Sequence, residues 1–199
     1  MFKKLITLPP FLNRYRYLGS AGALLMGVLL PSSLLASAAV AQQLNNDRSF
    51  FDHAPRLIRT AASFQDVYTP STYQFTIKVP EDAGANLQAV RIVQDNRNLG
   101  AVNFDISQSS AFLGETFAGG PAVSLASIGG TQPTDSNEVT VAFNPPIAPG
   151  QTVTVALQAD RNPWQGGVYL FGVTAYPIGE NSPGLFLGYG RINIYDNQR

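Results

Sequence analysis

Apolar and polar residues alternate regularly in several short stretches of this chain, and Thr72–Val79 is the clearest of them. Tyr73 and every second residue after it are apolar, whereas the residues between them are threonine, glutamine and lysine. A period of two is typical of a strand with one face on a core and the other in water. Pro80 ends the pattern, because proline has no backbone donor for a neighbouring strand. The pattern therefore predicts a strand over Thr72–Val79 with Thr76 on its solvent face.

A second stretch, Val168–Pro177, is rich in β-branched and aromatic residues and is largely apolar on both alternating faces. This composition favours a strand, because such side chains pack well on a pleated surface. A strand that is apolar on both faces is usually buried in the middle of a sheet. We therefore expect Val168–Pro177 to be the central strand around which the others are arranged.

Shorter stretches with similar properties predict the remaining strands. Pro55–Ala62 suits an edge strand, because its leading proline needs no hydrogen-bonding partner there. Ser107–Asn137 lacks regular periodicity and predicts a functional loop or an irregular edge, with short ordered pieces at Ala111–Leu113 and Ala122–Leu125. The other expected strands are Leu87–Val93, Gly100–Ile106, Glu138–Phe143, Gln151–Gln158 and Leu185–Tyr195.

A proline-rich segment, Asn144–Gly150, separates two strands that we expect to pair with each other, Glu138–Phe143 and Gln151–Gln158. Its three prolines lack a backbone donor, so the segment is not expected to continue a ladder of hydrogen bonds. Pro149-Gly150 suits a type II turn, in which the glycine takes a positive φ. Ile147 is expected to fill the end of the core.

Seven to nine short strands at regular spacing, without helical periodicity after residue 41, indicate an immunoglobulin-like β-sandwich of antiparallel strands. The cysteine and tryptophan spacing of antibody domains is absent, so only the architecture is indicated. Tyr169 follows Gly166-Gly167 and is placed where a tyrosine corner would bond its hydroxyl to nearby backbone.

The first 41 residues are organised like a secretory signal peptide, which forms a helix during export. Four basic residues precede the apolar run Leu18–Leu30, and Ala39-Val40-Ala41 then offers small residues before Gln42. We expect cleavage between Ala41 and Gln42, with a cut before Ala39 as the competing site. The expected organisation is a signal peptide over 1–41, a lead-in over 42–54 and a β-sandwich over 55–199.

An uncleaved N-terminal anchor is the alternative to this signal peptide. Leu18–Leu35 is barely long enough to span a bilayer, and it contains a proline and three serines. Contact with a membrane is expected only through this segment, if it is uncleaved. With either arrangement the domain lies outside the cytoplasm, in the periplasm or the extracellular medium.

Removal of the first 41 residues changes the charge of the chain. The whole sequence has 13 basic and 13 acidic residues, but four basic residues lie in this segment, so the remainder has a net charge of −4. An acidic domain with one lysine, Lys78, lacks the basic surface that nucleic acids select, and no nucleic-acid partner is expected. The absence of cysteine excludes disulfides, thiolate metal sites and cysteine nucleophiles.

Four phrases of the sequence resemble one known family: Tyr73–Gly84, Pro149–Val155, Tyr169–Pro177 and Gly188–Tyr195. The chain resembles an uncharacterised family of exported cyanobacterial proteins that is classed as a domain of unknown function. This resemblance covers nearly all of the chain after the signal peptide. It implies export in a cyanobacterium and brings no known activity or functional residues.

A weaker resemblance, to the periplasmic copper-carrier β-sandwiches, extends to architecture only. That family binds copper through several histidines, including one at the mature N-terminus. The only histidine of this chain is His53, inside the expected mature protein, so neither copper nor another cofactor is expected.

No residue pattern indicates a catalytic or metal site. A serine triad would need His53 as its base, and no Gly-x-Ser-x-Gly motif accompanies it. We interpret His53 as a solvated or packing residue. Glu81 and Asp82 are adjacent and diverge, although the sequence leaves open whether other acids oppose each other across a cleft. Two groups of oxygen-bearing side chains lack the spacing of a calcium loop and are interpreted as turn residues: Asp95, Asn96 and Asn98, and Asp135, Asn137 and Glu138.

Aromatic residues in loops and strand ends are the remaining candidates for binding. Trp164, the only tryptophan, could form a face that stacks on a sugar or a partner, together with Tyr68, Tyr176 and Tyr189. The alternative is that these aromatics cover the end of the sandwich, since tryptophan is usually well buried.

These observations favour a non-enzymatic exported envelope protein that binds another envelope protein or a surface component. A carbohydrate-binding module is the first alternative, and it requires Trp164 to be exposed beside other aromatics. A hydrolase of unrecognised type is the second alternative, and it requires a cleft in which His53 or paired acids meet a serine.

Overall fold

The computed structural model of the chain describes residues 48–95, 100–116, 119–128 and 138–196. All of them belong to the second of two compact units, which is Leu44–Arg199. The expected signal peptide and its cleavage site lie outside the described residues, as do Asn96, Asn98, Asp135 and Asn137. In the described part, no helix is long and apolar enough to cross a membrane.

The described residues form nine strands, which pair with their neighbours in an antiparallel sense in the order β1-β2-β7-β4-β5-β6-β3-β8-β9. The predicted immunoglobulin-like β-sandwich is therefore confirmed, and β1 is the predicted edge strand. The strands are β1 (Arg56–Ala62), β2 (Ser71–Lys78), β3 (Leu87–Gln94), β4 (Phe104–Leu113), β5 (Ala122–Ile128), β6 (Glu138–Ile147), β7 (Thr152–Ala159), β8 (Gly167–Pro177) and β9 (Leu185–Ile194).

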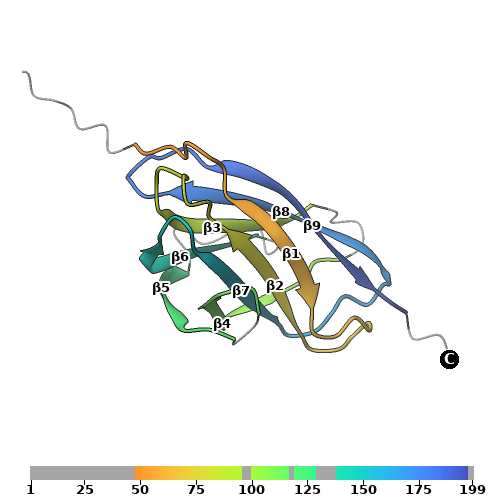
Figure 1. Cartoon of the computed structure of the whole chain (residues 1–199). Helices are drawn as coiled ribbons and strands as arrows, with labels where there is room; N and C mark the ends of the chain where they lie inside the picture. Colours follow the sequence, from red (N-terminus) through yellow and green to blue (C-terminus); the bar gives the residue numbers. More distant parts are fainter. Residues whose placement is uncertain (1–47, 96–99, 117–118, 129–137, 197–199) are drawn as a thin grey trace, which may run out of the picture. The chain divides into compact units, whose positions relative to one another are not determined.

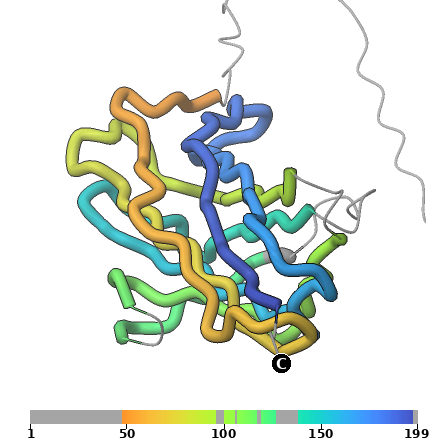
Figure 2. The backbone as a smooth tube through the Cα atoms, turned by 90° about the vertical axis from the view of Figure 1, so that its right-hand side faces the viewer, coloured from red at the N-terminus to blue at the C-terminus, as the bar shows by residue number. Residues whose placement is uncertain are grey.

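Strand β5 joins the two layers of the sandwich, because it pairs with β4 at its start and with β6 further along. On the opposite side, β1 lies beside β9 (Figures 1 and 2). A Cβ atom on Gly190 of β9 would lie 2.5 Å from the hydroxyl oxygen of Thr60 in β1. The two layers are therefore joined on this side by close packing between β1 and β9 and by a parallel bridge between Asp66 and Tyr195.

The core consists of the inward faces of both layers, and its centre is aromatic. The Phe171 ring meets Tyr73 and Phe75 edge-on, with centroids 5.6 and 5.7 Å apart. Every apolar residue of the alternating pattern in β2 is fully buried, as predicted. Ile147 is also buried and fills the end of the core.

Strand β8 is an inner strand, but it is not buried on both faces as predicted. Tyr169, Phe171 and Val173 have no solvent exposure, whereas Val168 on the other face is exposed. The prediction is wrong because each sheet of a two-layer sandwich turns one face outward. β8 also lies next to the edge strand β9, away from the centre of the order.

The outward face of β2 is more buried than its alternating pattern predicted. Thr76, predicted to face solvent, has only 1% of its surface exposed. Its hydroxyl lies 3.1 Å from the Thr154 hydroxyl of β7, which donates to the Gly114 carbonyl at 2.8 Å. The segment after β4 therefore covers this face of β2 near Thr76. The alternating pattern within β2 could not predict this, because the covering segment is distant in sequence.

The two strands around the proline-rich segment do not pair with each other. β6 pairs with β5 and β3, and β7 pairs with β2 and β4, so their connection crosses between the layers. β6 also continues past the prolines, since pairing with β3 resumes at Ile147 opposite Leu87. The predicted type II turn is confirmed: Gly150 has φ +82° and the Gln151 amide donates to the Ala148 carbonyl.

The stretch predicted to be irregular contains most of β4 and all of β5. β4 begins at Phe104, and its pairing with β7 jumps from Asp105 to Ser110. The Asp105 carboxylate holds this wide bulge, because it accepts hydrogen bonds from Ser107 and Gln108. The bulge interrupts the period of two and thereby hides the strand in the sequence.

Candidate functional site

One buried amide, Asn162, ties together two loops at one end of the sandwich. Its Nδ2 atom donates to the backbone carbonyls of Phe64 and Asp66 at 3.0 and 2.8 Å. Its backbone N–H donates to the Thr69 carbonyl at 2.7 Å. The loop between β1 and β2 is therefore fixed against the loop between β7 and β8.

Tyr73 of β2 completes the bonding of this amide. Its hydroxyl donates to Asn162 Oδ1 at 2.8 Å, with both side chains buried. Burial, supplemented by the neighbouring Tyr169, raises the pKa of the Tyr73 hydroxyl far above its usual range. The hydroxyl thus remains a neutral donor, and the amide has its donors and its acceptor occupied.

A second set of contacts fixes the residues that follow Trp164. The Tyr169 hydroxyl donates to the Gln165 carbonyl at 2.8 Å, which confirms the predicted tyrosine-corner contact. The backbone N–H of Gly166 donates to Asp196 Oδ1 at 2.7 Å. The backbone at Trp164 is therefore anchored on both sides.

Four exposed aromatic side chains gather on these two loops and on the adjoining end of β9; we call them the aromatic end: Phe64, Tyr68, Trp164 and Tyr195. Trp164 and Tyr68 are 61% and 60% exposed, and the other two rings are more than half exposed. Tyr68 donates its backbone N–H to the Pro163 carbonyl, and the backbone N–H of Tyr195 donates to the carbonyl of Gln65. Figures 1 and 2 show the C-terminal end of β9 beside the β1–β2 loop.

A depression of about 510 Å³ opens between Tyr68 and Trp164, and polar groups from three segments line it. Asp160 and Arg161 come from the loop after β7, and Asn103 from the residues before β4. Tyr68 has φ +59°, a left-handed conformation that is uncommon for a large side chain and often occurs at functional sites. The depression thus combines two aromatic rings with carboxylate, guanidinium and amide groups.

The structure separates the aromatic residues that the sequence suggested as one face. Trp164 and Tyr68 line the same depression, whereas Tyr176 lies at the other end of β8, roughly 30 Å from Gly167 along the strand. Tyr189 lies on β9 opposite Gly172, in the middle of β8. The binding roles of Trp164, Tyr176 and Tyr189 remain predictions.

Sequence reasoning overlooked Phe64 and Tyr195 as members of this end. Tyr195 ends the predicted last strand, and Phe64 follows the first one, so each resembles a strand terminus. The sequence does show aromatic residues just outside several strands, and this pattern could have indicated these two residues. The loops that carry them come together only in the folded sandwich.

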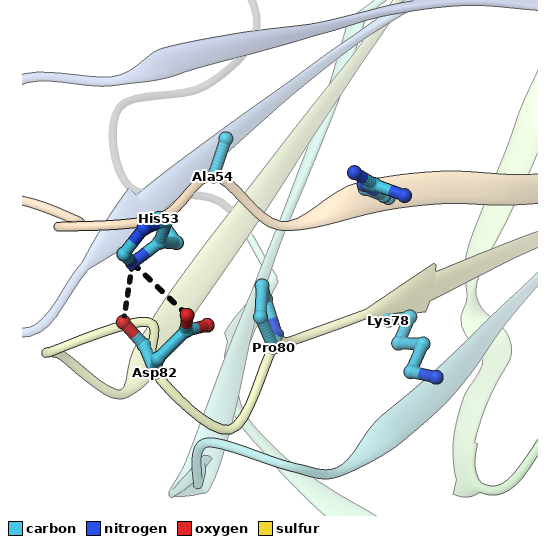
Figure 3. Close-up of a pocket in the computed structure, with 6 residues that line it drawn as sticks. His53, Ala54, Lys78, Pro80 and Asp82 are labelled. Atoms are coloured by element: carbon cyan, nitrogen blue, oxygen red, sulfur yellow. Dashed lines mark hydrogen bonds and ion pairs between the residues drawn. The ribbon is translucent and has the colours of Figure 1, made fainter.

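The other candidates of the sequence form separate contacts. His53 is exposed, and its Nδ1 lies 3.0 Å from the Asp82 carbonyl oxygen and 3.3 Å from Oδ2 (Figure 3). Arg91 bonds both carboxylate oxygens of Glu138, which lowers the pKa of that carboxyl. Among the described residues, no cluster of three histidine or acidic side chains is arranged for a metal ion.

Comparison with known proteins places this chain in one family. The model of a family described as "Protein of unknown function (DUF2808)" matches residues 48–194. The chain belongs to this family. The matched residues span all nine strands of this chain. No curated protein matches the sequence.

Several solved structures are similar in architecture. BslA, "a bacterial hydrophobin", is 11% identical with a TM-score of 0.43, covering 74% of this chain and 98% of its own. The collagen-binding subdomain of the Enterococcus faecalis surface protein ACE is 9% identical with a TM-score of 0.42, covering 74% and 97%. An uncharacterised Nocardia farcinica protein with an immunoglobulin-like fold is 13% identical with a TM-score of 0.37, covering 68% and 96%. Likenesses this distant carry no information on the function of this chain.

Proposed function

We propose that this protein is an exported, non-enzymatic binding module whose ligand is a carbohydrate held at the aromatic end. The observation that carries the proposal is the pair Trp164 and Tyr68, two rings about 60% exposed on either side of one polar depression. Tryptophan is usually well buried, so its exposure on an anchored loop needs a reason other than folding.

The chemistry of the depression suits a sugar better than an apolar ligand. An aromatic ring packs against the C–H face of a sugar ring, and hydroxyl groups need hydrogen-bond partners around it. Asp160, Arg161 and Asn103 supply charged and amide groups on the lining. Because Asn162 and Tyr169 already fix the loops, binding loses little conformational entropy, which favours affinity.

Export and the absence of catalysis are parts of the same proposal. The basic segment, the apolar run and the small residues before Gln42 support delivery to the periplasm or the extracellular medium. The pocket that His53 lines contains Asp82, Lys78 and Arg56 but no serine, so it does not assemble a hydrolase triad. A hydrolase would be supported by turnover of a bound glycan.

The fluorescence of Trp164 provides the test, because the chain has no other tryptophan. The protein as the cell exports it is titrated with soluble oligosaccharides prepared from the envelope and from the surrounding matrix. We expect a ligand-dependent emission change, and at least about tenfold weaker binding by Tyr68→Ala, measured by the same emission. Trp164→Ala, followed by calorimetry, should lose binding to a similar extent.

Tyr189→Ala is the matched control, because Tyr189 is also an exposed aromatic but lies on the outer face of β9. It should bind as the unchanged protein does. Equal losses for Tyr189→Ala and Trp164→Ala, or no glycan binding by the unchanged protein, would reject the aromatic end as a carbohydrate site.

A partner protein on the outer face of β8 and β9 is the second candidate function. Phe186 and Tyr189 are each 54% exposed and meet edge-on at 5.2 Å. A Cβ atom on Gly172 would lie 3.3 Å from the Phe186 ring and 3.4 Å from the Tyr189 ring, so both rings cover this glycine. Capture of one envelope protein that Phe186→Ala abolishes and Trp164→Ala preserves would support this candidate.

A further inference from the structure

Two cations face each other across the first strand pair of the sandwich. Arg56 of β1 is paired with Lys78 of β2 in the antiparallel register, so their side chains leave the same face as direct neighbours. Both are exposed, and like charges in this arrangement destabilise a sheet. The described residues provide neither side chain with an ion-pair partner. A bound anion would remove this repulsion.

A β-bulge adds a third cation to the same face. Leu57 pairs with Ile77, Arg59 pairs with Thr76, and Ile58 is the extra residue between them. Without the bulge, strict alternation would place Arg59 on the face opposite Arg56. With it, Arg59 joins Arg56 and Lys78, and we call these three residues the basic face.

The neighbouring strands add no compensating acid near these cations. Across β1, β2, β7 and β4 the only acidic residue is Asp105, which pairs with Gln158. Gln158 in turn pairs with Thr72, six residues from Lys78 and roughly 20 Å away along β2. The Asp105 carboxylate also accepts hydrogen bonds, first from Ser107 and then from Gln108, and these bonds lower its pKa.

A pocket of about 370 Å³ adjoins the basic face and is lined in part by Arg56 and Lys78. Its remaining lining is His53, Ala54, Pro80 and Asp82. Asp82 is the acidic residue of this lining, and its Oδ2 contacts His53 Nδ1 at 3.3 Å. Figure 3 shows Lys78 on the other side of Pro80 from the His53–Asp82 pair, and the ion pairs of the described residues do not include one between Asp82 and Lys78.

We propose that the basic face binds an anionic polysaccharide, through carboxylate or sulfate groups on its sugars. Thr152 of β7 pairs with Lys78 and is partly exposed, so it offers a neutral hydroxyl beside the cations, whereas the next outward residues, Thr76 and Thr154, are buried. The net charge of −4 expected for the mature chain repels a polyanion elsewhere on the surface. The polysaccharide is therefore directed to this face.

Other polyanions fit the same surface less well. Nucleic-acid-binding domains carry a larger basic footprint, whereas this chain is acidic after its signal peptide. Recognition of anionic lipid headgroups typically uses four to eight clustered cations, and the basic face has three. The proposal is also separate from the carbohydrate site at the aromatic end, because Tyr68 precedes β2 and Lys78 ends it.

The test uses paired polymers that differ in charge alone, dextran sulfate and dextran, with polygalacturonate as a carboxylated probe. Binding of the protein as exported is measured by calorimetry at low and at physiological salt. We expect both anionic polymers to bind to the basic face and uncharged dextran not to bind there. Binding of the anionic polymers should weaken at higher salt, because salt screens the charges. The double variant Arg56→Gln, Lys78→Gln should bind at least about fivefold more weakly.

Arg191→Gln is the charge-matched control, because Arg191 is an exposed arginine on β9, in the other layer. It should bind the anionic polymers within about twofold of the unchanged protein. If Arg191→Gln weakened polyanion binding as much as the double variant does, the binding would depend on net charge alone, and the proposal would be overturned. Tighter binding to duplex DNA or to phosphatidylglycerol vesicles, or no polyanion binding at low salt, would overturn it as well.

The melting temperature separates binding from folding in these variants. Replacement of Arg56 removes a like-charge contact, so Arg56→Gln should melt at the same temperature or higher. If the double variant does not fold, the variant Arg56→Lys, Lys78→Arg keeps both charges and should retain binding. Loss of polyanion binding in that folded, charge-conserving variant would overturn an electrostatic origin.

Discussion

Single buried polar residues determine the geometry of the aromatic end. Asn162 receives one hydrogen bond and donates three, and it has almost no contact with solvent. Among the described residues, no buried side-chain nitrogen or oxygen lacks a partner. A network of this kind is stabilising only while it is complete, because an unpaired buried polar group retains its desolvation cost.

Asn162→Ala is therefore expected to lower the free energy of unfolding by about 3 kcal/mol. It removes three side-chain hydrogen bonds and leaves the Tyr73 hydroxyl buried without its acceptor. Chemical denaturation measures the change. Asn193→Ala, at a partly exposed position with a single 3.3 Å contact to Arg191, should stay within about 0.5 kcal/mol. Similar costs for the two variants would contradict the role given to Asn162.

At the scale of elements, the outer layers differ in how their strand pairs are stabilised. β1 and β2 place like charges opposite each other, whereas β3 and β6 join opposite charges through Arg91 and Glu138. The guanidinium bonds both carboxylate oxygens, and this raises the pKa of Arg91 while lowering that of Glu138. Both side chains retain contact with water, so their pairing contributes modestly.

The pairing of Glu138 predicts a pH dependence. Its pKa is lower in the folded protein than in the unfolded chain, so the pair stabilises the protein above the usual glutamate range. This contribution is lost as the pH falls through the lowered folded pKa. Glu138→Gln should thus be less stable by about 0.2–1 kcal/mol at pH 7 and equally stable near pH 3. Denaturation at both pH values measures this, and the exposed Glu180→Gln should show no such change.

At the scale of the whole molecule, charge and aromatic surface are unevenly distributed. The chain is acidic after its expected signal peptide, yet three of its remaining nine basic residues share one sheet face. Four exposed aromatic residues, those of the aromatic end, gather at one end of the sandwich. The two proposed binding surfaces therefore differ in chemistry: the aromatic end suits a neutral glycan, and the basic face suits an anionic one.

Processing of the N-terminus is the prediction at this scale. Protein recovered from the cell envelope should begin at Gln42, because signal peptidase reads small residues such as Ala39 and Ala41 ahead of the cut. N-terminal sequencing or intact mass decides between this cut and one before Ala39. A membrane-bound chain that retains Met26 would instead establish an anchored domain.

The sequence alone determined the fold class and most of the strand positions. An alternating pattern records which side chains a core will bury, and it correctly assigned the inward face of β2. Local turn chemistry was equally readable: Gly150 takes the positive φ that its turn needs, and Tyr169 bonds the backbone four residues earlier. Each of these features depends on residues close together in the sequence, so the sequence alone is enough to predict it.

Only the tertiary structure decided which strands pair and which loops meet. The separation of β6 from β7 and the burial of Thr76 depend on segments distant in sequence, since any antiparallel strand could pair with several others. The aromatic end exists because Asn162 joins loops almost 100 residues apart. The basic face exists because a bulge at Ile58 turns Arg59 outward. Register and loop packing are set by contacts across the whole sandwich, and no local pattern encodes them.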